Sequence, residues 1–438
     1  MNISDLIRNL KLDDVGQEMY ALIEDLFPLC RSITGQGVRD TLRILQQHIP
    51  LQMHEVATGT QVFDWVIPRE WNIKDAYIKD ASGRRVIDFQ NSNLHVVSYS
   101  RPVKEKMSLG ELRSHLFTIP DRPEWIPYRT SYYKEDWGFC LSHQQLQQLS
   151  DSEYEVCIDS SLSEGHMTYG EYVLEGEQAK EVLFSSHICH PSLCNDNLSG
   201  IALMAILAKY LGTLKRRYTY RFLLIPSTIG SIAWLSRNEN RVNQIKHGLV
   251  LACVGDPGLL TYKKSRRGDA EIDRAAIHAL KHGGMAYNII DFFPYGYDER
   301  QFCSPGFNLP VGCLMRTPHG QFPEYHTSAD NLEFVKPEAL GRSFAAALSV
   351  LEILEQNKTF LNMYPKCEPQ LGKRGLYRTI GGQAGSADKQ LAQLWMLNLS
   401  DGSHTLLDIA ERSGLPFSAL CEAAEILLAS DLLKECPE

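Results

Sequence analysis

The stretch from residue 186 to 200, S-H-I-C-H-P-S-L-C-N-D-N-L-S-G, holds the side chains best suited to chemistry in this chain. His187 and Asp196 lie nine residues apart in it, and zinc is bound by imidazole nitrogens and carboxylate oxygens. A further imidazole is available downstream, at His326 in the segment E-Y-H-T-S-A-D. We therefore predict a metal site that contains His187, Asp196 and His326.

The elements on either side of this stretch place it at the edge of a sheet. The apolar run at 181–184 precedes it and predicts a buried strand, and residues 201–210 follow with helical spacing of apolar side chains. The loop then leaves the carboxyl end of a strand, which is where open α/β sheets keep their sites. Polar side chains at Asn195, Asn197 and Ser199 can fix the loop by hydrogen bonds to the backbone.

The same loop permits other interpretations. It could be a polar loop whose histidines are merely hydrogen-bonded. Cys189, His190 and Cys194 could instead bind zinc through sulfur, but a closed site needs a fourth ligand, and no second pair with C-x-x-C spacing exists. Either cysteine could also be a nucleophile. The second His–Asp loop downstream favours the first interpretation.

Length and composition bound the class of protein. A chain of 438 residues is too long for one core, and 44% hydrophobic and 22% charged residues are typical of soluble globular proteins. A net charge of −9 argues against a general nucleic-acid binder. The sequence shows neither a signal peptide nor an apolar run long enough to span a bilayer. Eleven scattered cysteines indicate reduced thiols, so we expect a cytoplasmic protein.

Changes of pattern along the chain predict its domains. Residues 1–54, with two helices between 15 and 49, join residues 137–365 in one α/β domain with a mixed sheet flanked by helices. Its strands are expected at 182–185, 221–226 and 248–254. Residues 55–136 are rich in aromatics and alternating runs and predict a small inserted β-rich domain with a turn at 80–83.

The C-terminal part is predicted to be separate. Residues 366–387, with several Gly and Pro, are interpreted as a linker, and residues 388–438 as a winged helix-turn-helix with Gly414 at the turn. Its acidic residues favour packing or dimerisation over DNA binding: Glu422, Glu425, Asp431 and Glu435. A homo-oligomer is compatible with this interpretation.

These motifs give the chain a family resemblance. It resembles the zinc-dependent aminopeptidases of the di-zinc exopeptidase superfamily, whose sheet fold is also called phosphorylase/hydrolase-like. More narrowly, over essentially its whole length it is similar to prokaryotic aminopeptidase-like proteins with an inserted β-rich domain and a C-terminal winged helix. The resemblance implies one or two zinc ions, with His187 on one ion, His326 on the other and Asp196 between them. Asp330 matches the late aspartate of the family motif.

The chain departs from that family at the general base. The family carries two glutamates after its third strand, whereas this chain has Ser227 and Thr228 there. A hydroxyl cannot replace a carboxylate as the base that activates water. Asp256, near the end of the next strand, is the candidate for a further acidic ligand. Asp298 or Glu299 is the candidate for the missing catalytic carboxylate.

The resemblance implies a metal-dependent hydrolase that cleaves the N-terminal peptide bond of a peptide, or a related amide bond in a small substrate. Ser227 supports a different possibility, a catalytically impaired binding or scaffold protein on a peptidase fold. A third candidate is a deacylase or amide-processing enzyme of polysaccharide or secondary-metabolite assembly.

Overall fold

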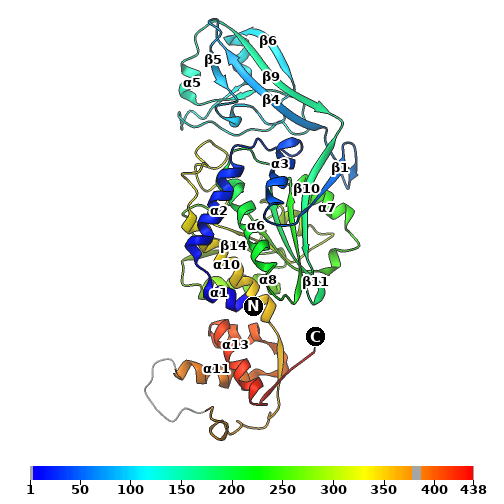
Figure 1. The fold of residues 1–438 in the computed structure, drawn as a ribbon, viewed down its shortest axis with the longest axis vertical. Coiled ribbons are helices and arrows are strands. Elements are labelled where there is room, and N and C mark those ends of the chain that lie inside the picture. Colours follow the sequence, from blue (N-terminus) through cyan, green and yellow to red (C-terminus); the bar gives the residue numbers. More distant parts are fainter. Residues whose placement is uncertain (1–2, 377–385, 438) are drawn as a thin grey trace. The chain divides into compact units, whose positions relative to one another are not determined.

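The computed structural model describes residues 3–376 and 386–437, and the chain divides into two compact units (Figure 1). The first unit comprises Met1–Gly268 and Ala286–Ala345, and the second comprises Asp269–Met285 and Ala346–Glu438. A large mixed sheet flanked by helices forms the first unit, which confirms the predicted fold class. Among the described residues, no helix combines the length and apolar character needed to cross a membrane.

Eight strands form the large sheet, in the order β1-β10-β12-β11-β13-β16-β14-β15. The central strands β12, β11, β13 and β16 run parallel to one another, whereas β1–β10, β10–β12 and β14–β16 are antiparallel pairs. The strands predicted from apolar runs correspond to β11, β12 and β13. The bounds are β1 (Gln52–Ala57), β10 (His166–Leu174), β11 (Gln178–His187), β12 (Tyr218–Ile225), β13 (Ile245–Leu251), β14 (Leu260–Lys263), β15 (Tyr287–Ile290) and β16 (Val311–Met315).

Helix α6 (Gly200–Leu211) is the central helix of this unit. Ten of its twelve residues are buried, because it lies between β11–β13 and α2. The two helices predicted between 15 and 49 are confirmed as α2 (Leu12–Leu26) and α3 (Gln36–Leu45). The other helices that begin in this unit are α1 (Ile3–Asn9), α4 (Leu109–Leu112), α5 (His143–Gln147), α7 (Ile229–Arg237), α9 (Glu299–Phe302) and α10 (Pro337–Gln356).

A second, four-stranded sheet occupies the region predicted as a β-rich insertion. Its antiparallel order is β5 (Arg85–Asp88), β4 (Glu70–Lys79), β9 (Glu153–Ser163) and β6 (Val103–Ser108). The turn predicted at residues 80–83 joins β4 to β5. Strand β9 lies beyond the predicted boundary at residue 136. It nevertheless belongs to this sheet, because it pairs with β4 along almost its whole length. Two short pairs complete the region: β2 (Gln61–Val62) with β3 (Trp65–Val66), and β7 (Leu116–Phe117) with β8 (Phe139–Cys140).

The second unit carries the predicted helix-turn-helix. Thr405 caps α12 by accepting a hydrogen bond from the backbone of Asp408, and Gly414 ends it in the left-handed conformation at φ 70°. Residues 377–385 of the predicted linker lie outside the described residues. The elements are α8 (Glu271–His282), β17 (Thr359–Asn362), α11 (Ser386–Leu399), β18 (Asp401–Thr405), α12 (Leu406–Ser413), α13 (Phe417–Ala429) and β19 (Leu433–Glu435).

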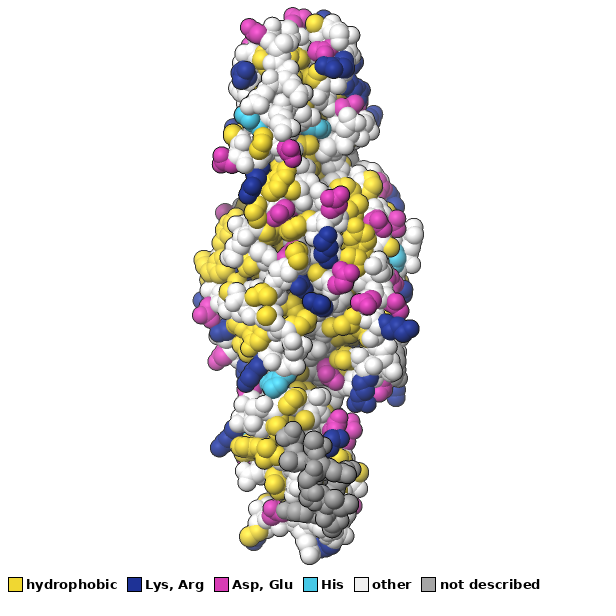
Figure 2. All heavy atoms as spheres, turned by 90° about the vertical axis from the view of Figure 1, so that its left-hand side faces the viewer, with side chains coloured by type: hydrophobic (Ala, Val, Ile, Leu, Met, Phe, Trp, Pro, Cys, Tyr) yellow, Lys and Arg dark blue, Asp and Glu magenta, His cyan; other side chains and the backbone are white. Residues whose placement is uncertain are grey.

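The acidic residues of this domain are exposed, as expected for a charged face: Glu422, Glu425, Asp431 and Glu435. On the described part of the face shown in Figure 2, basic and acidic side chains are interspersed.

A buried charge cluster joins three strands of the large sheet. Arg221 on β12 donates two hydrogen bonds to Glu181 on β11, at 2.7 and 2.6 Å, and one to Glu171 on β10, at 2.6 Å. The side chains of Arg221 and Glu181 are only 2% and 4% exposed. Trp234 on α7 also donates to Glu171. The cluster therefore fixes the lateral order of the strands that carry the loops at their carboxyl ends.

We expect Arg221→Met to destabilise the protein by about 3–5 kcal/mol, because it leaves two acidic groups without their cation in the interior. Urea unfolding followed by tryptophan fluorescence measures this loss. Arg43→Met, which breaks an exposed pair with Asp40, is the matched control and should cost about 1 kcal/mol or less. Equal effects of the two substitutions would contradict a special role for the buried cluster.

Candidate metal centre

The loops at the carboxyl ends of β11 and β12 leave the same edge of the sheet. The two strands are parallel, and the last residue of β11, His187, is in register with Ile225, the last residue of β12. The loop after β11 runs to Gly200, where α6 begins. The predicted position of the loop at the carboxyl end of a buried strand is therefore confirmed.

The Asp196 carboxylate lies at the centre of three imidazoles. His187 Nε2 is 2.9 Å from Oδ1, while His326 Nε2 and His190 Nε2 are 3.0 and 3.7 Å from Oδ2. Asp196 is fully buried. Burial by itself raises the pKa of Asp196, but the three histidines outweigh it and hold the pKa well below its ordinary value. The carboxylate is therefore ionised, as a metal ligand must be.

The donor set fits a divalent metal ion. One ligand atom from each of His187, His190 and Asp196 lies within 4.8 Å of the others. Asp196 Oδ2 and His326 Nε2 lie close together yet have no hydrogen-bond partner, so both are free to accept a cation. Burial lowers the pKa of His190 to about 3, which keeps this imidazole in the neutral form that binds metals. His190 thus joins the predicted residues; its signal in the sequence is its place three residues after His187.

A second aspartate holds the Asp196 loop from behind. Asp330 Oδ1 accepts the backbone N–H of Asn195 at 2.6 Å, and Oδ2 accepts that of Asp196 at 2.9 Å. Asn197 donates to Ser186, and Ser199 donates to the backbone of Asn195. The three polar side chains predicted to fix the loop do so, and the segment that carries His326 reaches the loop through Asp330.

Asp256 was predicted to be a metal ligand, but its carboxylate binds groups of the surrounding loops. Its oxygens accept hydrogen bonds from Asn195 Nδ2 at 3.1 Å, Gly258 N at 2.7 Å and Thr317 Oγ1 at 2.6 Å. It is thus used to brace loops and lies outside the group of ligand atoms found among the described residues. The geometry gives its predicted role as a metal ligand no support.

The Glu299 carboxylate also has a structural partner. Its Oε1 accepts a hydrogen bond from Lys263 Nζ at 2.8 Å, and neither side chain is exposed to solvent. Gly296 has to be glycine here, because a Cβ atom would lie 2.1 Å from Glu299 Oε1. Glu299 is held in a buried ion pair and is not among the residues that line the cavity, so the geometry does not support its predicted catalytic role.

Asp298 is the better-placed carboxylate. It is fully buried, Ser231 Oγ donates to its Oδ1 at 2.8 Å, and its Oδ2 has no hydrogen-bond partner. Burial raises the pKa of Asp298 to about 6, and nearby His187, Ser231 and Ser227 limit the rise. Since Ser227 helps to lower the pKa of Asp298, the two side chains lie near each other.

The cysteines of the loop are protonated thiols. Burial raises the pKa values of Cys189 and Cys194 far above the ordinary value. Cys189 makes its contacts with the backbone of Ser227 and with His190 Nδ1. Neither sulfur belongs to the ligand group, so the structure favours the His–Asp set over the sulfur site and over a cysteine nucleophile.

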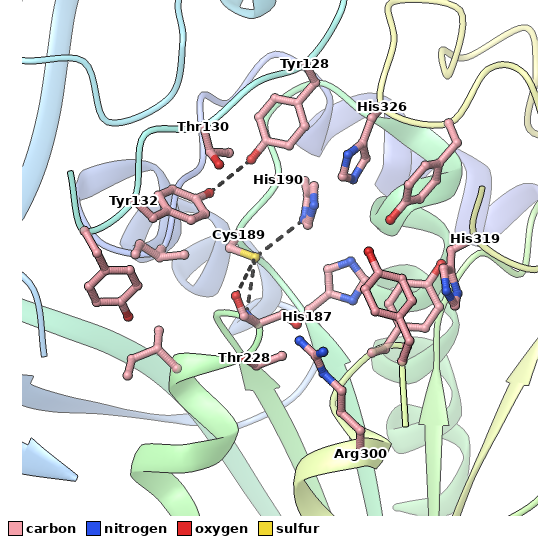
Figure 3. Close-up of a pocket in the computed structure, with 18 of the residues that line it drawn as sticks. Tyr128, Thr130, Tyr132, His187, Cys189, His190, Thr228, Arg300, His319 and His326 are labelled. Atoms are coloured by element: carbon pink, nitrogen blue, oxygen red, sulfur yellow. Dashed lines mark hydrogen bonds between the residues drawn. The ribbon is translucent and has the colours of Figure 1, made fainter. Parts of the chain in front are cut away.

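The metal centre forms one wall of a cavity of about 340 Å³ (Figure 3). Tyr128, from the region predicted as the insertion, packs its ring against His190 and His326 and donates its backbone N–H to His326 O. Several lining residues had no functional role predicted from the sequence, among them Tyr128, Tyr297, Arg300, His319 and Tyr325. They come from three separate segments of the chain, and no motif connects these segments.

We expect Asp330→Asn to lower the affinity for a divalent metal ion by about 10–100-fold, because an amide nitrogen would face one of the two backbone N–H groups that position Asp196. Competition with a chromophoric chelator measures the affinity. The control is Asp75→Asn, in the β4–β5 sheet, where the aspartate pairs with Arg85. An unchanged metal affinity in Asp330→Asn would show that the loop does not need this support.

Models of two known protein families match most of the chain. The family model described as Domain of unknown function (DUF4910) matches residues 20–357, and a winged helix-turn-helix model matches residues 358–435. A Clostridium acetobutylicum protein, provisionally described as a polysaccharide biosynthesis protein with an aminopeptidase-like domain, is 55% identical over 421 residues. The match covers 96% of this chain and 97% of that protein.

Solved structures agree with this placement. The crystal structure of a provisionally described peptidase from Clostridium acetobutylicum matches with a TM-score of 0.94 and 52% identity, covering 99% of both chains. A zinc aminopeptidase from Bacillus subtilis matches with a TM-score of 0.57 and 12% identity, covering 77% of this chain and 95% of that one. The second match shows a likeness of fold, and it confirms the aminopeptidase-like architecture. With a family model spanning most of its α/β unit and β-rich region, and a winged helix-turn-helix behind it, the chain belongs to the family described as Domain of unknown function (DUF4910).

Proposed function

We propose that this protein is a zinc-dependent hydrolase that cleaves an N-terminal peptide bond or a related amide bond. The observation that carries the proposal is the buried Asp196 carboxylate surrounded by His187, His190 and His326 at the edge of a cavity. These residues would hold one or two zinc ions. When bound, zinc acts as a Lewis acid on the amide carbonyl. The description of the Clostridium acetobutylicum relative as aminopeptidase-like supports this reading.

The chain's own residues supply the proton transfer in this proposal. Ser227 lines the cavity, and Asp298 lies behind it with one free oxygen. As water attacks the amide carbonyl, it gives a proton to Ser227 Oγ, and the Ser227 hydroxyl proton passes to Asp298 Oδ2. When the carbon–nitrogen bond breaks, the proton returns from Asp298 through Ser227 to the leaving amine nitrogen, which leaves the free carboxylic acid as the other product. The pair thereby replaces the single carboxylate that the resembling enzymes place at this position, and Asp298 takes the role first predicted for Glu299.

Ser227 also favours a second candidate function, a binding or scaffold protein that keeps the metal site without efficient catalysis. A relay through a hydroxyl is less direct than a carboxylate in contact with water. We therefore expect weak hydrolysis of ordinary aminoacyl anilides. The odd number of scattered cysteines further leads us to propose a cytoplasmic location, with peptides or small amides as substrates.

Metal analysis tests the first part of the proposal. Protein purified without chelator should contain zinc, and His187→Ala should lose more affinity than the factor of about 10–100 typical of residues that only support ligands. Elemental analysis and chelator competition give both values. His166→Ala, which removes an exposed histidine paired with Glu55, should behave as wild type. A wild-type protein that neither contains zinc nor takes it up would overturn the proposal.

Kinetics of L-leucyl-4-nitroanilide hydrolysis test the relay. Ser227→Ala and Asp298→Asn should each lower kcat by about 10²–10⁴-fold, the usual contribution of a general base. Ser231→Ala removes the other hydroxyl on Asp298 and should have a much smaller effect, because Ser231 does not line the cavity. Adding Ser227→Glu to Asp298→Asn should restore part of the rate.

The relay is excluded if Ser227→Ala and Asp298→Asn turn over as fast as the wild type. If the zinc-loaded wild type and the Ser227→Glu variants hydrolyse no amide at all, the binding-protein function replaces the hydrolase.

A further inference from the structure

The charge of the cavity wall is unusual for a site that receives an amine terminus. None of the described residues that line the cavity is Asp or Glu, and one of them, Arg300, is a permanent cation. Ser227 and Thr228, which also line the cavity, are uncharged. A wall of this kind complements an anion.

Arg300 has no protein partner to neutralise it. It follows Asp298 and Glu299 in the chain, whose carboxylates accept hydrogen bonds from Ser231 and Lys263, and within the described residues it forms no ion pair with either. Within the described residues, the guanidinium makes neither a hydrogen bond nor an ion pair, and its Nε is buried without an acceptor. Its one close charge contact is the Tyr295 ring, 5.7 Å from Cζ. Figure 3 shows the side chain extending from α9 towards Thr228 and His187.

A buried donor without an acceptor is costly, and a ring contact compensates a cation only weakly. Arginine's planar fork of N–H groups matches a carboxylate in a bidentate arrangement. Because the wall offers a single guanidinium, it is matched to one negative charge and less to a phosphate dianion.

His319 gives the anion a second polar neighbour. It lines the same cavity, its Nδ1 is buried without a partner, and its ring contacts Tyr295 and Tyr297 at 5.2 and 5.3 Å. Burial lowers the pKa of His319; the charges of Lys263 and Arg300 also lower it, while those of Glu299 and Asp196 oppose the shift. The imidazole is therefore a neutral hydrogen-bonding group on an aromatic wall.

We propose that Arg300 binds a carboxylate of the substrate, so that the enzyme acts on amides that carry an acidic group next to the bond to be cleaved. The aromatic side chains, including Tyr297 and Tyr325, pack against the uncharged part of that substrate. This inference rests on the proposed hydrolase function and names its substrate class. A cavity of about 340 Å³ limits the recognised group to about the size of one residue.

Paired substrates test the inference on the zinc-loaded full chain. On the acyl side, L-glutamyl-4-nitroanilide is compared with L-glutaminyl-4-nitroanilide; on the amine side, Leu-Gly is compared with Leu-glycinamide. In one of these pairs, the acid should exceed the amide in kcat/KM by about 10–100-fold, the usual value of a hydrogen-bonded charge. Arg300→Gln should abolish that preference, mainly through KM, and Arg300→Lys should keep part of it.

Two controls show whether a negative result comes from a wrong substrate class or from a misfolded variant. Arg266→Gln removes a cation that donates to Asn308 outside the cavity and should leave the preference intact. Thermal unfolding and zinc content identify a variant that is misfolded. If neutral amides are cleaved as well as acids and Arg300→Gln changes nothing, this inference fails while the hydrolase function stands. If no amide is cleaved by the wild type, the hydrolase function fails, and the substrate class fails with it.

Discussion

The burial of the Asp196 carboxylate is the constraint on which the site depends. A carboxylate without solvent is tolerated only when opposite charge or hydrogen bonds compensate it. Here three imidazoles face its oxygens, at 2.9, 3.0 and 3.7 Å. Imidazole nitrogens and a carboxylate are also the groups that bind zinc in proteins. Burial and donor type thus make this cluster the candidate metal site.

Keeping Asp196 in place requires support from distant parts of the chain. Asp330 accepts two backbone N–H groups of the loop, and Asp256 orients Asn195 from another loop. These acidic residues bind backbone and amide groups, so they cannot also serve as ligands. Arg221 also has a structural role below this edge of the sheet, because it binds Glu181 and Glu171 on neighbouring strands. Most buried charges near this edge position strands and loops, and few are left for chemistry.

Asp298, Glu299 and Arg300 follow one another at the start of α9, but their side chains point in different directions and have different roles. Glu299 points to Lys263 and forms a buried ion pair with it, whereas Asp298 points to Ser231; each carboxylate keeps one oxygen without a hydrogen-bond partner among the described residues. Arg300 points into the cavity and has no partner among the described residues. Adjacent ionisable groups therefore act as a structural pair, a candidate base and a candidate anion receptor. A short helix turns each successive side chain by about 100°, which is enough to send them to different surroundings.

The sequence alone determined the fold class, the main strands and helices, and the pairing of His187 and Asp196, because hydrophobic periodicity and loop position are local properties. It also identified His326 and the substitution at Ser227, through motifs. It could not assign Asp256, Asp298 and Glu299, since the role of a carboxylate depends on which donors reach it from other loops. The sequence offered His190 only as a possible partner of Cys189 and Cys194, and the tertiary structure placed it beside Asp196 instead. Arg300 and the tyrosines of the cavity wall were decided by tertiary structure alone. Their function comes from converging at one sheet edge, and no spacing in the chain encodes that convergence.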